Sequence, residues 1–380
     1  MKANTFVYPF VPFVNLADKN IHNNLISKKG IDLSELKRLI EILPMPNPQI
    51  NGETIAEKIL SIFQDENYRF GPREYIQENK DFWVSKLNYF INHGLLIQLT
   101  ILGFPFKVPV PLKTSRTFPD MGEVLSLLRL SEIADNIQKV YPPGAVITIF
   151  TEGVFGRFSG VPEEDWIAYR EFLEKLNELL GLNSVLKIID LSEMEKIVPD
   201  FQGHYQKRVA EFKELYQKQD PDFLAKYRGT YESVLRIVST KMYDESLLMD
   251  VYNENLKDEE ITAEARKVRE DIKKRTHESI FQYHAYLKTR DDIDYLEKVV
   301  PHGLPLTVSP KANRLGIFPV SRICTRLPYH GVPVYSPRKN LFLIEYLIDI
   351  KRRQENYTQV YFDQDQDNKP FYYIALDNKI

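Results

Sequence analysis

The sequence of 380 residues contains a single cysteine, Cys324. One cysteine excludes an intramolecular disulfide and a cysteine-rich zinc site, and it is typical of a protein from a reducing compartment. The sequence also lacks a Walker loop, a Gly-x-Gly-x-x-Gly fingerprint, a His-Glu-x-x-His pair and a Gly-x-Ser-x-Gly elbow. Cofactor-dependent redox chemistry is therefore not indicated.

Long apolar segments and an excess of charge of one sign are missing as well. The start of the chain is apolar, but Pro9 and Pro12 interrupt it and no small-residue cleavage site follows before Asp18, which argues against a signal peptide and a spanning helix. The 50 Lys and Arg residues are interleaved with 53 Asp and Glu residues, so no basic field favours nucleic acid. We expect a soluble, cytoplasmic protein that binds neither membrane nor nucleic acid.

Apolar residues, in contrast, are plentiful. Hydrophobic residues make up 43% of the chain, which suffices for a sizeable core. The middle of the chain alternates apolar, β-branched runs with segments of helical spacing, and this alternation predicts an α/β fold with a largely parallel, Rossmann-like central sheet flanked by helices. The expected strands are 95–102, 145–150 and 185–191, and the expected helices are 124–140 and 163–180.

Composition also suggests how the chain is divided. Residues 1–52 mix Pro, Asn and Gly and read as an N-terminal extension, and residues 53–335 form the expected α/β domain. Within that domain, the charged residues 201–300 have helical spacing and predict a helical cap or insertion. Further strands are expected at 304–308, 315–320 and 331–335, and a C-terminal extension, 336–380, is expected to contain a helix at 341–350 and strands at 357–361 and 371–375.

The segment 104–113 reads Phe-Pro-Phe-Lys-Val-Pro-Val-Pro-Leu-Lys. Its prolines fix φ and remove backbone donors, so the segment should follow a stiff, extended path. Lys107 and Lys113 lie on this path, Arg116 follows, and no acidic residue precedes them back to Ile97. Such a cationic patch could receive a phosphate or a carboxylate. The alternative is a solvated surface loop whose lysines serve solubility.

Together with motifs further along the chain, this segment resembles the isocyanide (isonitrile) synthase family, which includes the pyoverdine and dityrosine biosynthesis proteins. The resemblance spans residues 55–335, and the lysine-proline segment is its most specific part. The other motifs, in order, are Pro119-Asp120 with Glu123, Tyr141-Pro142-Pro143-Gly144-Ala145, Gly160-Val161-Pro162-Glu163, Tyr227-Arg228-Gly229, Arg314-Leu315-Gly316-Ile317 and Pro328-Tyr329-His330-Gly331-Val332.

The resemblance implies an enzyme that joins the amino group of an amino acid to the ketone carbon of ribulose 5-phosphate, and this carbon becomes the isonitrile carbon. It implies neither a metal nor an organic cofactor. It also implies a downstream iron- and 2-oxoglutarate-dependent oxygenase. Such chemistry needs cations for the phosphate and the carboxylate, and acid–base groups to move protons. The candidate catalytic residues are Lys107, Glu152 and His330, and the candidate substrate-binding residues are Lys113, Arg116, Asp120, Arg228 and Arg314.

Several candidates have a structural alternative. Glu152 could cap the turn after its strand, and the spacing of Asp120 and Glu123 is that of a helix capping box. Arg228 could form an interhelical salt bridge, and His330 could be a hydrogen-bonded structural histidine.

The chain departs from the family at one expected strand. Where the family commonly carries Arg-Leu-Ser-Ile-His, this chain has Pro305 in place of the arginine and Ser309 in place of the histidine. Arg314 or Arg157 could supply the missing charge. Two alternatives stay open: a carbon–nitrogen transferase such as an amino-acid N-formylating enzyme on the same fold, and a catalytically silent relative that binds a phosphorylated metabolite.

Overall fold

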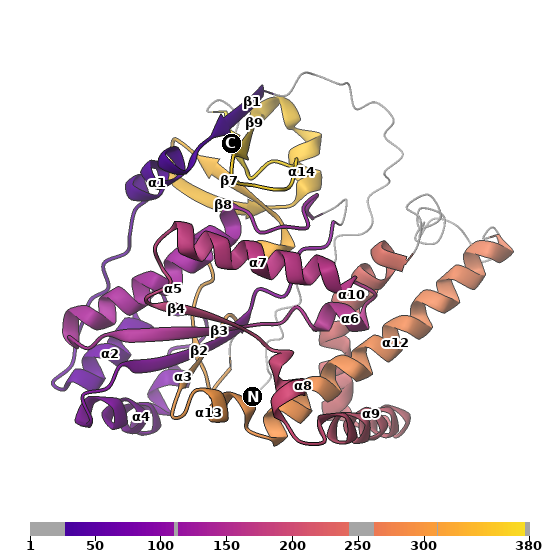
Figure 1. The fold of residues 1–380 in the computed structure, drawn as a ribbon, viewed down its shortest axis with the longest axis horizontal. Coiled ribbons are helices and arrows are strands. Elements are labelled where there is room, and N and C mark those ends of the chain that lie inside the picture. The colour runs from indigo at the N-terminus through magenta and orange to yellow at the C-terminus, as the bar shows by residue number, and fades with distance from the viewer. Residues whose placement is uncertain (1–26, 110–112, 243–261, 310, 377–380) are drawn as a thin grey trace.

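Two five-stranded sheets organise the part of the chain that the computed structural model describes, residues 27–109, 113–242, 262–309 and 311–376 (Figure 1). The first sheet has the order β4-β3-β2-β5-β6, and all its neighbouring strands are parallel. The predicted α/β fold with a parallel sheet is therefore confirmed. The strands are β2 (Ile97–Gly103), β3 (Ala145–Thr151), β4 (Leu186–Asp190), β5 (Leu304–Thr307) and β6 (Leu315–Gly316).

The central strand β3 shows why this sheet forms. Each of its residues is buried, as expected of an apolar, β-branched strand that helices cover on both faces. Helix α5, which connects β2 to β3, packs against β3 and β4, and its predicted capping box of Asp120 and Glu123 is present. The helices of this layer are α2 (Ile55–Gln64), α3 (Glu74–Gln77), α4 (Lys80–Asn92), α5 (Met121–Val140), α6 (Phe155–Phe158), α7 (Glu163–Leu179) and α8 (Glu193–Ile197).

The second sheet, of order β1-β9-β10-β7-β8, joins distant parts of the sequence. Strand β1 comes from the expected N-terminal extension and pairs with β9 from the expected C-terminal extension, while β7 comes from the region between them. The sheet thus crosses both predicted domain limits. Its strands are β1 (Ser27–Ile31), β7 (Val332–Ser336), β8 (Leu341–Glu345), β9 (Tyr357–Phe362) and β10 (Tyr372–Ala375), and α1 (Leu33–Ile42), α14 (Leu347–Arg352), η1 (Pro328–His330) and η2 (Gln354–Asn356) lie next to them in sequence.

One secondary-structure prediction in this region is wrong. The expected helix at 341–350 begins as strand β8, and α14 starts only at Leu347. Phe342 and Ile344 are buried and alternate with partly exposed residues, which is the period of a strand. The local sequence is compatible with a helix and with a strand, and antiparallel pairing with β7 stabilises the strand.

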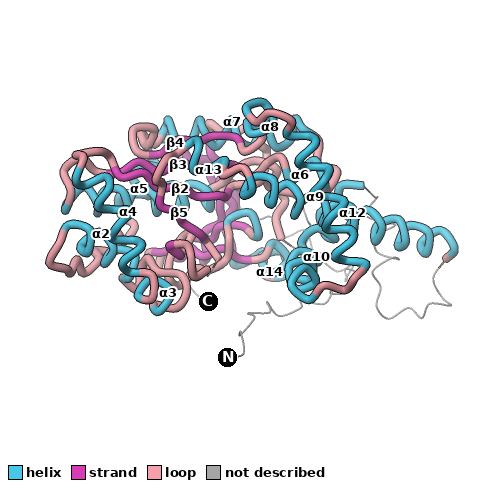
Figure 2. Tube along the Cα trace, turned by 90° about the horizontal axis from the view of Figure 1, so that it is seen from below, coloured by secondary structure: helices cyan, strands magenta, loops and turns pink. Residues whose placement is uncertain are grey.

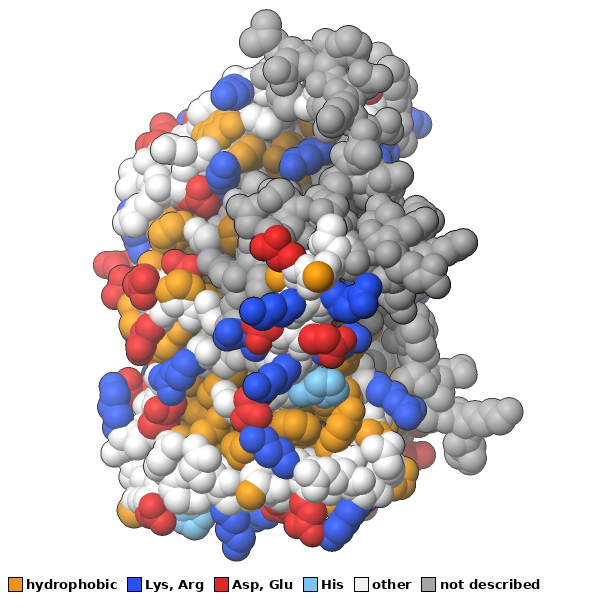
Figure 3. All heavy atoms as spheres, turned by 90° about the vertical axis from the view of Figure 1, so that its right-hand side faces the viewer, with side chains coloured by type: hydrophobic (Ala, Val, Ile, Leu, Met, Phe, Trp, Pro, Cys, Tyr) orange, Lys and Arg blue, Asp and Glu red, His pale blue; other side chains and the backbone are white. Residues whose placement is uncertain are grey.

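In the region predicted to be a helical cap or insertion, the described residues 201–242 and 262–300 are largely helical, and the helices α9, α10 and α12 lie at one end of the molecule (Figures 1 and 2). Residues 243–261 of this region lie outside the described residues. Helix α12 packs against α9 and α10, and several of the contacts are between aromatic rings, such as Phe223 of α10 against Phe281 of α12. On the face that carries this region, cationic and acidic side chains alternate with hydrophobic ones (Figure 3). None of the described helices is long and apolar enough to cross a membrane. The helices are α9 (Phe201–Gln217), α10 (Pro221–Met242), α12 (Ala263–Asp292) and α13 (Tyr295–Val299).

Candidate active site

The carboxyl ends of β2, β3 and β5 meet at one edge of the parallel sheet, where α/β proteins commonly bind ligands. The segment that contains Lys107 follows β2, Glu152 follows β3, and Arg314 lies in the loop after β5. The backbone N–H of Glu152 donates to the carbonyl of Gly103 over 3.2 Å, which holds the ends of β2 and β3 together. Lys107 and Glu152 are therefore at this edge, as parallel pairing requires, whereas Arg314 is the last residue before β6 and interacts with Glu152 through its side-chain charge.

Lys107 is buried in an ion-paired cluster, which we call the Lys107 triad. Only 2% of Lys107 is exposed, and its Nζ lies 2.5 Å from Oδ2 of Asp120 and 2.8 Å from Oε2 of Glu123, both fully buried. The alternative of a solvated surface lysine is therefore wrong for this residue. The two carboxylates also cap α5, since Asp120 accepts from the N–H of Gly122 and Glu123 accepts from the N–H of Asp120, each over 2.8 Å.

The residue that contacts Glu123 from α7, Tyr169, is also buried. The hydroxyl of Tyr169 donates to Oε1 of Glu123 over 3.1 Å, and burial holds the pKa of Tyr169 well above its usual value. Burial also raises the pKa of Asp120; the charge of Glu123 raises it further, whereas Lys107 and Arg116 oppose the shift. With its charges paired inside the protein, the triad anchors the lysine-proline segment to the first turn of α5.

Arg116 is likewise engaged within the protein. Its Nη2 lies 2.7 Å from Oδ2 of Asp365 and donates to the carbonyl of Pro119 over 3.0 Å, and its Nη1 donates to the carbonyl of Lys369 over 2.8 Å. Only 1% of Arg116 is exposed. These contacts join the loop before α5 to the segment between β9 and β10, and they leave the guanidinium no open side for the predicted substrate.

The remaining predicted residues lie outside the Lys107 triad and are at least partly exposed. Lys113 lies with its Nζ 3.2 Å from Nδ1 of His330, so the two candidates do meet, and both are partly buried. Arg228 is exposed on α10, and its side chain has no hydrogen bond or ion pair with a described residue. Arg157, proposed to replace a missing charge, is engaged with Glu195 over 3.1 Å.

Glu152 lies in different surroundings, beside cations from distant parts of the chain. Its side chain is partly buried and makes no hydrogen bond or ion pair within the described residues. Burial raises the pKa of Glu152, and the charges of Arg290, Lys311 and Arg314 oppose this shift. We call these four residues the Glu152 cluster. A carboxyl group with a raised pKa at the edge of a sheet is suited to acid–base catalysis at neutral pH.

Sequence reasoning missed Arg290 and Lys311. Arg290 lies near the end of α12 in a densely charged stretch that gave no motif, and Lys311 lies three residues before the motif at Arg314. Although Lys311 as a residue is exposed, desolvation lowers its pKa, and the charges of Arg314 and Arg290 lower it further. Desolvation likewise lowers the pKa of Arg314, with Arg290 as the next cause. The charges of Arg290, Lys311 and Arg314 thus act on one another and on Glu152.

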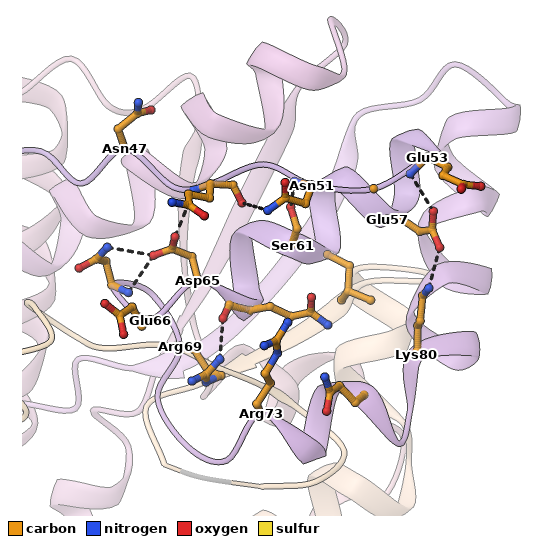
Figure 4. A pocket seen from close by; sticks show the side chains of 16 residues that line it. Asn47, Asn51, Glu53, Glu57, Ser61, Asp65, Glu66, Arg69, Arg73 and Lys80 are labelled. Atoms are coloured by element: carbon orange, nitrogen blue, oxygen red, sulfur yellow. Dashed lines mark hydrogen bonds and ion pairs between the residues drawn. The ribbon is translucent and has the colours of Figure 1, made fainter.

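Two hollows of the described surface are lined by no residue of the Lys107 triad or of the Glu152 cluster. A polar groove of about 970 Å³ runs between the loop before α2, α2 itself and α3 (Figure 4). Lys80 pairs with Glu57 there over 2.6 Å, and none of the predicted site residues lines the groove. A small apolar cavity of about 30 Å³ lies between the end of β2 and η1. Within the described ranges, no three His, Cys, Asp or Glu side chains gather as metal ligands.

Comparison with known proteins gives a family match over most of this region. Residues 87–343 match the family described as pyoverdine/dityrosine biosynthesis protein. The chain is 24% identical over 268 residues to the L-tryptophan isonitrile synthase AmbI2 of Fischerella ambigua, covering 68% of this chain and 74% of that one. It is 27% identical over 292 residues to the L-tyrosine isonitrile synthase of Xenorhabdus nematophila, covering 74% and 82%.

Two further similarities concern the fold and a second branch of the family. The crystal structure of the PvcA protein from Pseudomonas aeruginosa superposes with a TM-score of 0.63 at 22% identity, over 85% of this chain and all of that one. The spore wall maturation protein DIT1 of Saccharomyces cerevisiae is 30% identical over 172 residues, which cover 44% of this chain and 31% of that one. The fold described above is thus that of a solved structure.

Proposed function

Because this chain belongs to the pyoverdine/dityrosine biosynthesis protein family, we propose that it is an isonitrile synthase acting on an amino acid, with ribulose 5-phosphate as the one-carbon donor. The observation that carries the proposal is the match, over more than two thirds of both chains, to synthases of L-tryptophan and L-tyrosine isonitriles. The Glu152 cluster supports it, since it brings a carboxyl group of raised pKa together with three cations, two of which, Lys311 and Arg314, form no ion pair with a described residue.

Within this proposal, Glu152 is the acid–base residue. The substrate amine must lose a proton before its nitrogen attacks the ketone carbon, and the ketone oxygen must gain protons before it leaves as water. A carboxylate of raised pKa accepts the first proton more readily than an ordinary one and can return it to the oxygen. Lys113 and His330, which contact each other, are the second pair through which a proton could move.

Lys107, Asp120 and Arg116 take structural roles in this assignment. Lys107 and Asp120 are engaged with each other and with Glu123, and Arg116 is engaged with Asp365 and backbone carbonyls. They hold the lysine-proline segment and α5 in place beside the strand ends. The exposed Arg228 stays a predicted substrate-binding residue without a structural contact that supports it.

A second function, amino-acid modification without isonitrile formation, is favoured by two observations. One is the match to spore wall maturation protein DIT1, and the other is the presence of Pro305 and Ser309 where the family commonly has arginine and histidine. An N-formylating carbon–nitrogen transferase would fit both. The downstream iron- and 2-oxoglutarate-dependent oxygenase stays a prediction.

Mass spectrometry of the purified protein incubated with ribulose 5-phosphate and a pool of amino acids tests the proposal. An isonitrile synthase produces a compound that has gained one carbon and lost two hydrogens relative to one amino acid in the pool. An N-formyl amino acid instead supports the second function. If neither product forms and no amino acid is consumed, the protein is not a synthase, and a silent relative that binds a phosphorylated metabolite becomes the better assignment.

A further inference from the structure

We propose that Arg290, Lys311 and Arg314 form the subsite that holds the phosphate group of a sugar phosphate. That the phosphate belongs to a sugar substrate rests on the proposed function, whereas the binding of a phosphate to these three cations does not depend on it. The subsite combines the end of α12 with the loop between β5 and β6, two elements from different layers of the fold.

Geometry places the three cations at the edge where Glu152 lies. The loop that contains Lys311 and Arg314 begins at the carboxyl end of β5, which is parallel to β2, and β2 is parallel to β3. Within this loop the N–H of Arg314 donates to the carbonyl of Lys311 over 3.3 Å, so the two residues belong to one turn. Arg290 interacts electrostatically with both of them and with Glu152.

The cations of this subsite have donors to spare. Arg290 uses Nε and Nη2 on Oδ1 of Asp291, at 2.9 and 2.6 Å, but its Nη1 is buried without a hydrogen-bond partner among the described residues, and only 3% of Arg290 is exposed. The side chains of Lys311 and Arg314 make no hydrogen bond or ion pair with any described residue. An unsatisfied buried donor is costly, and a bound anion would remove that cost.

A phosphate group fits this arrangement better than a carboxylate does. It carries close to two negative charges at neutral pH and three acceptor oxygens, and guanidinium groups bind such oxygens in pairs. The three cations outnumber the two carboxylates beside them, Glu152 and the Asp291 that pairs with Arg290, so the cluster keeps positive charge to bind an anion. Other cations near this edge are engaged elsewhere: Lys107 in its triad, Arg116 with Asp365, and Arg157 with Glu195.

Isothermal titration calorimetry of the full chain with inorganic phosphate, ribulose 5-phosphate and unphosphorylated ribulose tests the subsite. Arg314→Gln and Lys311→Gln should each weaken binding of both phosphates at least about tenfold, because each removes a charge-assisted hydrogen bond. Arg157→Gln, which removes an exposed and already paired cation, is the matched control and should bind as the wild type does. The binding of unphosphorylated ribulose should be the same for the wild type and for the variants. Arg290 is left unchanged because its burial makes a folding defect possible.

The outcomes separate the subsite from the proposed function. Wild-type affinity for both phosphates in Arg314→Gln and Lys311→Gln, or no phosphate binding by the wild type, would overturn the subsite. Loss of amino-acid binding with phosphate binding retained would also overturn it, because the cluster would then hold a carboxylate. Variants that lose phosphate in a protein that forms no isonitrile leave the subsite standing and the function refuted. Isonitrile formation with phosphate binding unaffected by the substitutions refutes only the subsite.

Discussion

The Lys107 triad and the Glu152 cluster lie at the same edge of the parallel sheet, yet they differ in how their charges are satisfied. Lys107, Asp120 and Glu123 are at most 2% exposed and are engaged with one another. In the Glu152 cluster, the side chains of Glu152, Lys311 and Arg314 make no hydrogen bond or ion pair within the described residues.

The difference separates structural charges from charges that await a ligand. Removing one partner of a buried ion pair leaves an uncompensated charge, so such a cluster tolerates little change and has little left to offer a substrate. Cations that are close together without counter-ions repel one another, and a bound anion relieves this repulsion. Stability should therefore depend on the Lys107 triad, and activity on the Glu152 cluster.

The largest expected effect follows from removing Lys107. Lys107→Met leaves Asp120 and Glu123 buried without their cation and should lower the free energy of unfolding by about 3–5 kcal/mol. Denaturant unfolding followed by circular dichroism measures the change. A variant that unfolds at the wild-type denaturant concentration but has lost activity would show that Lys107 acts on the substrate and would break the comparison.

A change in the other cluster should affect rate without affecting stability. Glu152→Gln removes an acid–base group that makes no hydrogen bond, so kcat should fall by roughly 10²-fold or more while the free energy of unfolding does not fall. Because burial raises the pKa of Glu152, the wild-type rate should decline on the acidic side at a pH above the usual 4.5 of a glutamate. A pH profile of kcat/KM that keeps this decline in Glu152→Gln would assign it to another group.

The pH dependence of stability gives a further test of the Lys107 triad. Burial raises the pKa of Asp120 above 3.8 in the folded protein, so its contribution to stability is present below about pH 4 and is lost as the pH rises towards neutral. Asp120→Asn does not titrate and keeps an oxygen that can accept the N–H of Gly122.

Relative to Asp120→Asn, the wild type should therefore lose about 1 kcal/mol of unfolding free energy or more between about pH 5 and about pH 8. Urea unfolding of both proteins at a series of pH values gives the difference. If this difference is constant with pH, the pKa of Asp120 is not raised in the folded protein.

The smallest effect is expected at Lys113, on the same proline-rich segment as Lys107. Lys113 is only partly buried, so Lys113→Met should change the free energy of unfolding by about 0.5 kcal/mol or less. Unfolding in parallel with Lys107→Met makes the pair of lysines an internal comparison. Equal destabilisation by the two substitutions would mean that burial of the ion pair is not what distinguishes them.

Much of the fold could be predicted because it depends on local patterns. The β-branched run of β3, the capping box of α5 and the helical spacing of α7 each specify an element within a few residues of the observed one. Parallel pairing also explains why Lys107 and Glu152 lie at one edge, since residues after neighbouring parallel strands share the same end of the sheet, whereas Arg314 was a candidate only through its family motif. The helix expected over β8 was wrong because the partner β7 decided between two compatible local structures.

What the sequence by itself determined is most of the elements, the parallel sheet and the family, because hydrophobic periodicity and contiguous motifs are encoded over short distances. Only the tertiary structure decided which charges are engaged with each other. It buried Lys107 between two carboxylates of a helix start and brought Arg290 from the end of α12 to Glu152 and Arg314. Electrostatic interactions depend on distance in space and on burial, and neither can be read from the separation of residues along the chain.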